Sequence, residues 1–389
     1  MSRLPILYQW RDEIKRNLPS LTLPQATVLA IWSMGIWLSG TASLSKAVLY
    51  AHRRIGQSYN TVNQRAKEWY KDASHKSGRH RATLCVEDCF ADLLRWILRA
   101  WKGRVILLAL DATTIGDRFT LLCVSVLFRG TAIPVAWHVL PGNKKEAWQP
   151  HWGALLDRLK GSGKDGATVL ALADRGLYSK WLFKKIASMG WHPFLRIQLG
   201  GYFTPEGGAM RPLGSFVGPC GHVLGVRGIA FKKDERRLPC TMVTWHQEGM
   251  EPLLVLTDME PDACDPLWYK SRFWIEREFK TRKSAAMQLQ RTRMTDPARL
   301  SRLLLAIAVS VLRAISEGSQ SEDNGDGEPL YNVAKGLRRR SSGTRGRRNC
   351  LYNVGRSLIE EIIMTGKRFR PIILRAEPLC GQEVVANTS

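Results

Sequence analysis

The sequence is poor in acidic residues and lacks any long apolar run. Asp and Glu number 34 against 58 Lys and Arg, so the formal net charge is +24. The longest apolar stretch, 26–38, is interrupted by Ser33 and Gly35 and is shorter than the roughly 20 residues that a membrane helix needs. No charged-then-apolar leader with a small-residue cleavage site follows Met1. We therefore expect a soluble, cytoplasmic protein without a membrane partner, whose positive charge attracts a polyanion.

Recognisable cysteine and histidine patterns are also missing. Cys85 and Cys89 have no matching Cys or His pair at the spacing of a zinc finger or ribbon, and reduced thiols are the default in a cytosolic protein. The histidines are scattered, and none pairs with a Ser or Cys nucleophile in a known arrangement. The sequence therefore indicates neither a zinc site nor a nucleophilic Ser or Cys.

Two aspartates each follow a continuous apolar run. Segment 104–110 leads into Asp111, and segment 167–173 leads into Asp174. Such runs predict fully buried strands, and a carboxylate just past a buried strand lies at the sheet edge where ligands bind. Taken alone, each aspartate would equally well cap a helix or stabilise a turn. Asp258 also follows an apolar strand, but there a turn role is favoured.

A third carboxylate stands in a regular pattern with Tyr269, Arg272, Glu276 and Lys283. On one continuous helix, at about 100° per residue, these four side chains share a narrow face, and Glu278 lies on the opposite side. One carboxylate among cations on a rigid helix suits a site that binds a divalent metal while holding phosphates. The alternative is an ordinary solvated helix, which the intervening aromatic residues disfavour.

This Tyr-x2-Arg-x3-Glu-x6-Lys pattern resembles the signature of the bacterial DDE transposases of the insertion-sequence-four family. The resemblance implies that Asp111, Asp174 and Glu276 are catalytic and bind two Mg²⁺ ions, with Mn²⁺ as a substitute. It also implies a set of DNA-binding residues in the helix and in the segment after Asp174, which looks like the second-aspartate motif of the family. That set is Tyr269, Arg272, Lys283, Arg175 and Tyr178.

The resemblance implies an α/β fold with a ribonuclease-H-like catalytic core, in which helices flank a mixed sheet, at 101–316. A β-rich insertion at about 200–255 would precede the helix that carries Glu276. The sequence patterns agree with that core. They predict strands at 119–128, 132–140 and 190–197, and helices at 148–160, 179–188 and 300–315.

Residues 1–100 predict a helical DNA-binding domain with helices at 24–38, 43–54 and 58–70. The last two helices favour a helix-turn-helix, whose second helix would present base-reading and phosphate-binding side chains, although ordinary helical packing explains the pattern as well. These side chains are Asn60, Asn63, Gln64 and Lys67.

The C-terminal part divides by composition. An acidic, Gly- and Ser-rich segment predicts a flexible linker at 317–330. Residues 331–389 predict a basic tail region, with an arginine tract at 338–348 for nonspecific phosphate contacts and one amphipathic helix at 353–365.

The family resemblance implies a cut-and-paste DNA transposase of the bacterial nucleoid, which cleaves transposon ends and transfers them into target DNA. Its partners would be double-stranded DNA, as inverted-repeat ends and as target, and a second copy of the chain in a DNA-bound homodimer. Some relatives stack a displaced base on a tryptophan, for which Trp245 is a candidate. Two alternatives remain open: a metal-dependent nuclease of the same fold without strand transfer, and a non-cutting regulator derived from a transposase.

Overall fold

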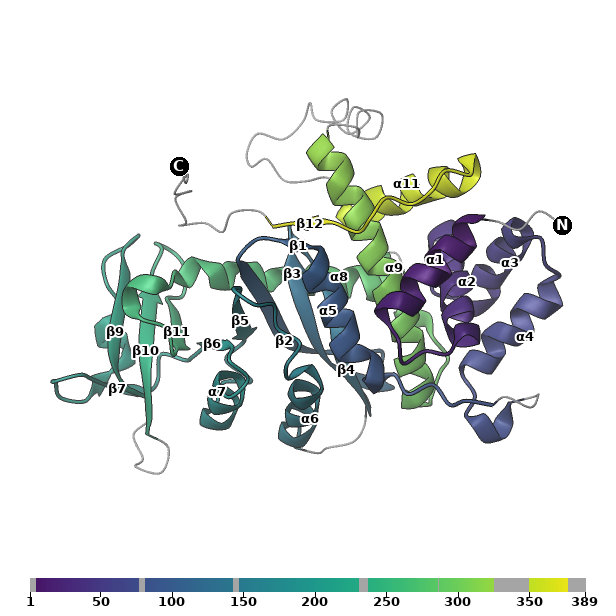
Figure 1. Ribbon diagram of the computed structural model, residues 1–389. Coiled ribbons are helices and arrows are strands. Elements are labelled where there is room, and N and C mark those ends of the chain that lie inside the picture. Colours follow the sequence, from purple (N-terminus) through teal and green to yellow (C-terminus); the bar gives the residue numbers. More distant parts are fainter. Residues whose placement is uncertain are drawn as a thin grey trace.

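A single ten-stranded mixed sheet runs through the molecule (Figure 1). The computed structural model describes residues 5–76, 81–142, 147–230, 237–285, 287–324 and 350–376. The strand order is β4-β3-β2-β5-β6-β11-β10-β9-β7-β8. The bounds are β2 Val105–Ile115, β3 Phe119–Phe128, β4 Thr131–Pro141, β5 Thr168–Ala173, β6 His192–Arg196, β7 Tyr202–Pro205, β8 Arg211–Pro212, β9 Val223–Ala230, β10 Leu238–Trp245 and β11 Leu253–Thr257.

The first half of the sheet follows the apolar runs of the sequence. Strands β2, β3 and β4 are joined antiparallel, and β5 and β6 run parallel to β2. Residues 106–110 and 169–173 are buried, as the continuous apolar runs predict. One expectation is corrected: Asp111 lies inside β2, not past its end. Pairing with β3 continues to Ile115, whereas pairing with β5 stops at Leu110.

The predicted β-rich segment 200–255 extends this sheet. Strands β7, β8, β9 and β10 lie between β6 and β11 in the sequence and are paired antiparallel. Strand β11 returns the chain to β6, with Val255 opposite Arg196 and Leu256 opposite Leu195. The insertion is therefore continuous with the central strands through backbone hydrogen bonds.

Helices cover both faces of the central strands. Figure 1 shows α5 in front of the sheet and α8 behind it. Helix α7 packs on β6, and both α8 and α9 pack on β4. Among the described residues no single helix is long and apolar enough to cross a membrane. Helices α2 (Leu23–Ser39) and α3 (Leu44–Ile55) together pass on length and composition, but the pair is bent by 100°. The bounds are α5 Phe90–Ala100, α6 Gln149–Leu159, α7 Lys180–Ala187, α8 Phe273–Lys280 and α9 Pro297–Asn324.

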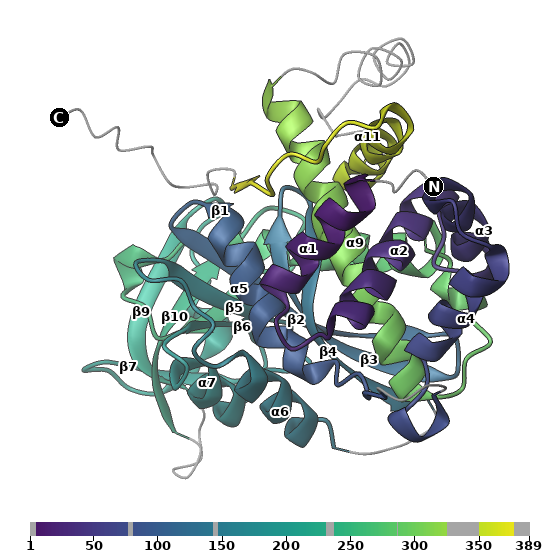
Figure 2. The same ribbon diagram turned by 45° about the vertical axis from the view of Figure 1, so that its right-hand side comes forward.

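The N-terminal helices share a core with α9 (Figure 2). They are α1 Pro5–Asn17, α2 Leu23–Ser39, α3 Leu44–Ile55 and α4 Tyr59–Trp69. The indole nitrogen of Trp37 donates to the carbonyl of Ser310 at 3.1 Å, and that of Trp69 donates to the carbonyl of Arg302 at 2.9 Å. Because buried indole N–H groups require partners, these bonds fix the helices on α9.

Helix α9 extends further than the sequence pattern predicts. The predicted helix ends at 315 and the linker begins at 317, but α9 continues to Asn324 through the acidic segment. Arg313 and Glu317 form a buried ion pair one turn apart, which removes the cost of burying either charge alone. Residues 325–349, which include the arginine tract 338–348, lie outside the described residues.

The predicted helix at 353–365 is present as α11 Leu351–Thr365, and it packs on α9. The two helices approach so closely at Gly355 that an added Cβ would lie 1.7 Å from the carbonyl oxygen of Ala314. Farther on, β12 Leu374–Arg375 pairs in parallel with β1 Trp101–Lys102. Residues 350–376 are thus an integral part of the fold, which corrects the expectation of a separate tail beginning at 331.

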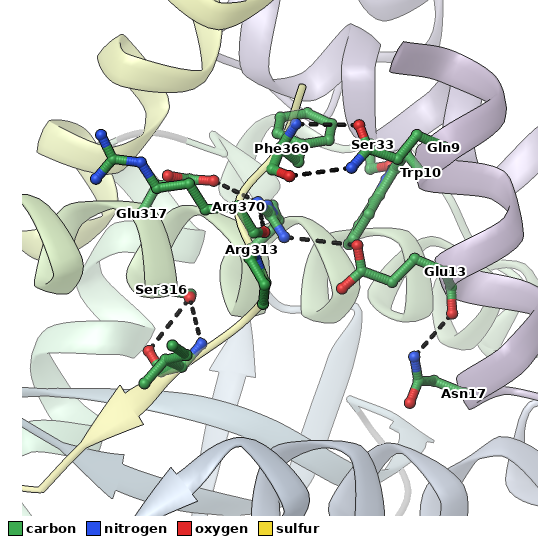
Figure 3. Close-up of polar contacts among 12 residues, drawn as sticks. Gln9, Trp10, Glu13, Asn17, Ser33, Arg313, Ser316, Glu317, Phe369 and Arg370 are labelled. Atoms are coloured by element: carbon green, nitrogen blue, oxygen red, sulfur yellow. Dashed lines mark hydrogen bonds and ion pairs between the residues drawn. The ribbon is translucent and has the colours of Figure 1, made fainter. Parts of the chain in front are cut away.

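Side chains of α1 and α9 hold the segment between α11 and β12 (Figure 3). Gln9 makes two hydrogen bonds of 3.0 Å with the backbone of Phe369. The Ser316 hydroxyl bonds both backbone groups of Ile373. The guanidinium of Arg313 lies 4.4 Å from the ring centroid of Phe369 and also bonds the carbonyl of Arg370. These contacts satisfy backbone groups that no neighbouring strand pairs.

Candidate active site

The register of β2 and β5 brings the two predicted aspartates to the same edge of the sheet. Leu110 pairs with Ala173. Asp111 and Asp174 are the next residues along the two chains, so they lie at the same level of the sheet. The Asp174 carboxylate accepts from the backbone N–H of Gly176 at 3.0 Å, closing a tight turn. A Cβ at Gly176 would lie 3.2 Å from that carboxylate oxygen, so glycine suits the close approach. The turn holds Asp174 one residue beyond β5, level with Asp111 of β2.

The segment that carries the third carboxylate is helical throughout but is not one regular helix. Residues Pro266–Arg272 form a 3₁₀ helix, Phe273–Lys280 form α8, and Thr281–Ala285 form a π-helical turn. The Asp265 carboxylate caps the first turn by accepting from the N–H of Leu267 at 2.8 Å. The expectation of one continuous helix is therefore corrected, but side chains at i and i+3 of a 3₁₀ helix lie on one face, so Tyr269 and Arg272 still share a side of the segment.

Arg272 contacts all three predicted catalytic carboxylates. Its Nη2 lies 3.0 Å from Oδ2 of Asp111 and 3.5 Å from Oδ2 of Asp174. Its Nη1 donates to Oε1 of Glu276 at 3.1 Å. The Arg272 side chain is only 6% exposed, whereas those of Asp174 and Glu276 are 40% and 53% exposed. The carboxylates from β2, from the turn after β5 and from α8 therefore meet around one buried cation.

Burial dominates the electrostatics of this cluster. It raises the pKa of Asp111 to about 6, against the lowering effect of Arg272 and of the Ala112 N–H. Burial also raises the pKa of the Tyr269 hydroxyl. Burial and the neighbouring Arg282 lower the pKa of Lys283, with Asp111 opposing them. Asp111 is thus a carboxylate whose charged form is poorly stabilised by its surroundings.

Tyr269 and Lys283, the first and last residues of the signature, are buried and half-buried respectively. Tyr269 is 2% exposed, and its hydroxyl has no hydrogen-bond partner among the described residues. Nε of Arg272 likewise has none. Lys283 is half-buried. Asp111 lies close enough to it to oppose the lowering of its pKa. Two buried polar atoms at the cluster therefore keep unused hydrogen-bonding capacity, which a bound polar group could satisfy.

Arg175 and Tyr178, predicted from the motif after Asp174, lie on the turn leading to α7. Nη1 of Arg175 lies 3.0 Å from Oε1 of Glu251, and Nη2 of Arg196 lies 2.9 Å from Oε2 of the same carboxylate. Tyr178 is half-buried against the core. Sequence analysis missed Arg196 and Glu251, because Glu251 precedes β11 in a segment with no motif and meets these arginines only through the β6–β11 pairing.

Asp258 lies at the other edge of the sheet. Its Oδ1 contacts Nδ1 of His192 at 2.9 Å, at the first residue of β6, whereas Asp174 follows the last residue of the parallel strand β5. This position separates it from the three carboxylates.

Trp245, the candidate stacking residue, lies under Lys270, whose Nζ is 3.9 Å from the ring centroid.

Glu278 faces the sheet and is buried. It forms an ion pair with Arg282, with 2.5 Å between Arg282 Nε and Oε1 of Glu278, and both side chains are 2% exposed. Burial raises the pKa of Glu278. The prediction that Glu278 points away from Glu276 agrees with this position, but Glu278 has a structural partner there.

The three carboxylates have the donor chemistry that Mg²⁺ prefers. As they stand, within the described ranges, no three Asp, Glu, His or Cys side chains are arranged to hold a metal ion. The terminal nitrogens of Arg272 contact oxygens of all three carboxylates instead. Among the described residues the Tyr269 hydroxyl and Arg272 Nε have no hydrogen-bond partner, and as donors they suit a bound oxygen atom and not the cation itself. The fit to a cation rests on the three carboxylates alone and requires the Arg272 guanidinium to leave the space between them.

Comparison with known proteins gives little. No protein-family model matches the sequence, and no curated protein matches it. One similar solved structure is the "Cryo-EM structure of piggyBac transposase synaptic complex with hairpin DNA (SNHP)", at 12% identity and a TM-score of 0.37. The match covers 68% of this chain and 53% of that one, so this chain spans about half the length of that protein. At this TM-score the likeness establishes neither a shared fold nor a shared activity.

Replacing Glu278 by Ala should destabilise the protein by about 3–5 kcal/mol, because Arg282 would remain buried without its partner. Glu276→Ala is the matched control. Its side chain is 53% exposed, so its loss should cost less than about 1 kcal/mol. Urea unfolding of both variants measures the difference, and equal midpoints would contradict a structural role for Glu278.

Asp111→Asn should stabilise the metal-free protein more at about pH 7.5 than at about pH 5. An unfolded Asp has a pKa near 3.9, and the folded value is raised to about 6. Folding thus favours the protonated carboxyl. The stability that this protonation contributes is fully present below about pH 3.9 and is lost as the pH rises through about 6. The amide of the Asp111→Asn variant cannot ionise, so its contribution to stability does not change over this pH range. Thermal unfolding in EDTA at both pH values tests this, and a pH-independent difference would refute it.

Proposed function

We propose that this protein is a DDE transposase, a metal-dependent enzyme that cleaves and joins DNA. The observation that carries the proposal is the meeting of Asp111, Asp174 and Glu276 around Arg272. Three carboxylates delivered by two neighbouring parallel strands and a helix suit the phosphodiester chemistry implied by the signature. The strand order β4-β3-β2-β5-β6, antiparallel and then parallel, supports a ribonuclease-H-like core.

Asp111, Asp174 and Glu276 would hold Mg²⁺. When bound, Mg²⁺ supplies activation of a water or 3′-hydroxyl nucleophile and stabilisation of the leaving oxygen. The remaining residues act on the substrate. Lys283, beside Asp111, and Arg272 would bind phosphates near the scissile bond, and the Tyr269 hydroxyl would donate to a phosphate or sugar oxygen.

The DNA partner is supported by the net charge of +24 and by the surface of α3 and α4. Gly56, at a φ of 64°, ends α3, and the Ser58 hydroxyl caps α4 by accepting from the N–H of Thr61. On α4, Asn60, Gln64 and Lys67 are exposed, as a recognition helix requires, and Asn63 is half-buried. Binding as a homodimer is part of the same proposal.

A nuclease of the same fold without strand transfer would share the three carboxylates. Joining of cleaved ends to a second DNA molecule separates the two activities, because only a transposase uses the freed 3′-hydroxyl as a nucleophile. A non-cutting regulator is disfavoured, since none of the three carboxylates has been lost.

Asp111→Asn, Asp174→Asn and Glu276→Gln should each abolish Mg²⁺-dependent cleavage of DNA that carries the ends of the protein's own element. Each change removes one carboxylate charge from the cluster. Binding to the same DNA in EDTA should be unchanged or tighter, because a negative charge near phosphate is lost. Asp258→Asn, at the opposite sheet edge, is the control and should cleave normally. Full cleavage by any of the three variants would exclude its residue from the site.

Asn60→Ala and Gln64→Ala should reduce discrimination among DNA sequences selected from a random pool, by about 1–3 kcal/mol where a bidentate base contact is lost. Lys67→Ala should instead weaken binding to all sequences and lower the salt slope of log affinity by about one. Competition binding at fixed salt distinguishes these effects. Undiminished selectivity in both amide variants would place recognition outside α4.

A further inference from the structure

Arg272 stands where a metal ion between the carboxylates would stand. One nitrogen, Nη2, lies 3.0 Å from Asp111 and 3.5 Å from Asp174, and the other terminal nitrogen lies 3.1 Å from Glu276. The side chain is 6% exposed, so it is held within the cluster and does not sample solvent freely. In the metal-free protein, Arg272 neutralises part of the mutual repulsion of the carboxylates.

A divalent ion and this guanidinium cannot share the space. Mg²⁺ draws its oxygen ligands to about 2.0–2.1 Å, whereas the carboxylate oxygens of Asp111 and Asp174 now rest on the same nitrogen. Two cations in contact also repel each other strongly in a partly buried site. Metal binding therefore requires Arg272 to leave at least the two aspartates.

We propose that Arg272 is an internal competitor of the metal and that a substrate phosphate displaces it. This inference rests on the proposed function. A guanidinium forms its strongest hydrogen bonds with carboxylate and phosphate, so a phosphate is the group best able to replace the lost partners. Among the described residues, Nε of Arg272 and the Tyr269 hydroxyl have no hydrogen-bond partner, and both can donate to that phosphate. Tyr269 lies three residues before Arg272 in the same 3₁₀ helix, where side chains at this spacing lie on one face.

Coupling of this kind is reciprocal. A phosphate that draws Arg272 away raises the affinity of the carboxylates for metal, and bound metal frees Arg272 for phosphate. The carboxylates would thus bind metal weakly without DNA, which limits hydrolysis by an enzyme that has no substrate in place. Arg272 is in this sense a positioning residue, acting through the carboxylates on the metal.

Isothermal titration of the full-length protein with Mn²⁺, at fixed pH and salt and without DNA, tests the proposal. Arg272→Gln should bind Mn²⁺ on the order of tenfold or more tightly than the wild type, because a unit charge is removed from contact with the ion. Arg272→Lys keeps the charge but not the fork that bridges the carboxylates, and should bind with intermediate affinity. Circular dichroism establishes that each variant is folded.

Arg196→Gln is the matched control. It removes the same charge, but the Arg196 guanidinium pairs with Glu251 at 2.9 Å and does not contact the three carboxylates. Its Mn²⁺ affinity should stay within about twofold of the wild type, since the pair is partly screened by solvent. An equal gain in Arg196→Gln and Arg272→Gln would reduce the effect to net charge and overturn the proposal.

The outcomes also separate this inference from the proposed function. If Arg272→Gln and the wild type bind Mn²⁺ equally, while Asp111→Asn abolishes binding, the metal site stands and competition by Arg272 is refuted. If neither protein binds Mn²⁺ in a way that Asp111→Asn changes, both the inference and the metal-dependent function fail. Should Arg272→Gln not fold, Arg272→Lys decides, and affinity no tighter than that of the wild type refutes the competition.

Discussion

The parallel pairing of β2 with β5 is the contact on which the candidate site depends. Its last rung, between Leu110 and Ala173, puts Asp111 and Asp174 at the same level of the sheet. A shift of this register by one residue would turn one aspartate to the other face, because side chains alternate along a strand. Residues 106–110 and 169–173 are buried on both faces of the sheet, so a shifted register would require close-packed side chains of different sizes to repack. The geometry of the carboxylates is therefore a consequence of core packing.

Burial of arginine is a second constraint on this strongly basic chain. Arg272, Arg282 and Arg313 are each almost fully buried, and each pairs with a carboxylate four residues away in the same helical stretch of chain. An unpaired buried charge costs several kcal/mol, so these acids are needed where they stand. Two of the pairs are structural, joining α8 to the sheet and α9 to the C-terminal segment. Arg313 also contacts Glu13 of α1 at 3.5 Å, whereas Arg272 contacts one carboxylate from β2 and one from the turn after β5, so its position is sensitive to whatever binds between them.

The C-terminal segment shows how composition can mislead about domain organisation. Residues 317–324 look like the start of a linker because they are acidic and polar, yet they continue α9. Their helical state depends on Arg313 and on α11, which crosses α9 at Gly355. Contacts between residues so distant in sequence leave no periodic signal in either segment. The same holds for Phe369, whose partners include Trp10 and Trp37 at the other end of the chain.

The sequence by itself determined the buried strands, most helices and the three carboxylates as a candidate set. These features come from local signals: continuous apolar runs, turn residues and a fixed spacing of residue types. Only the tertiary structure decided how the carboxylates are neutralised. The signature helix is divided into 3₁₀, α and π turns, and Arg272 points into the cluster instead of outward. The orientation of the Arg272 side chain depends on burial and on the carboxylates of β2 and of the turn after β5. No local sequence pattern around residue 272 encodes these contacts.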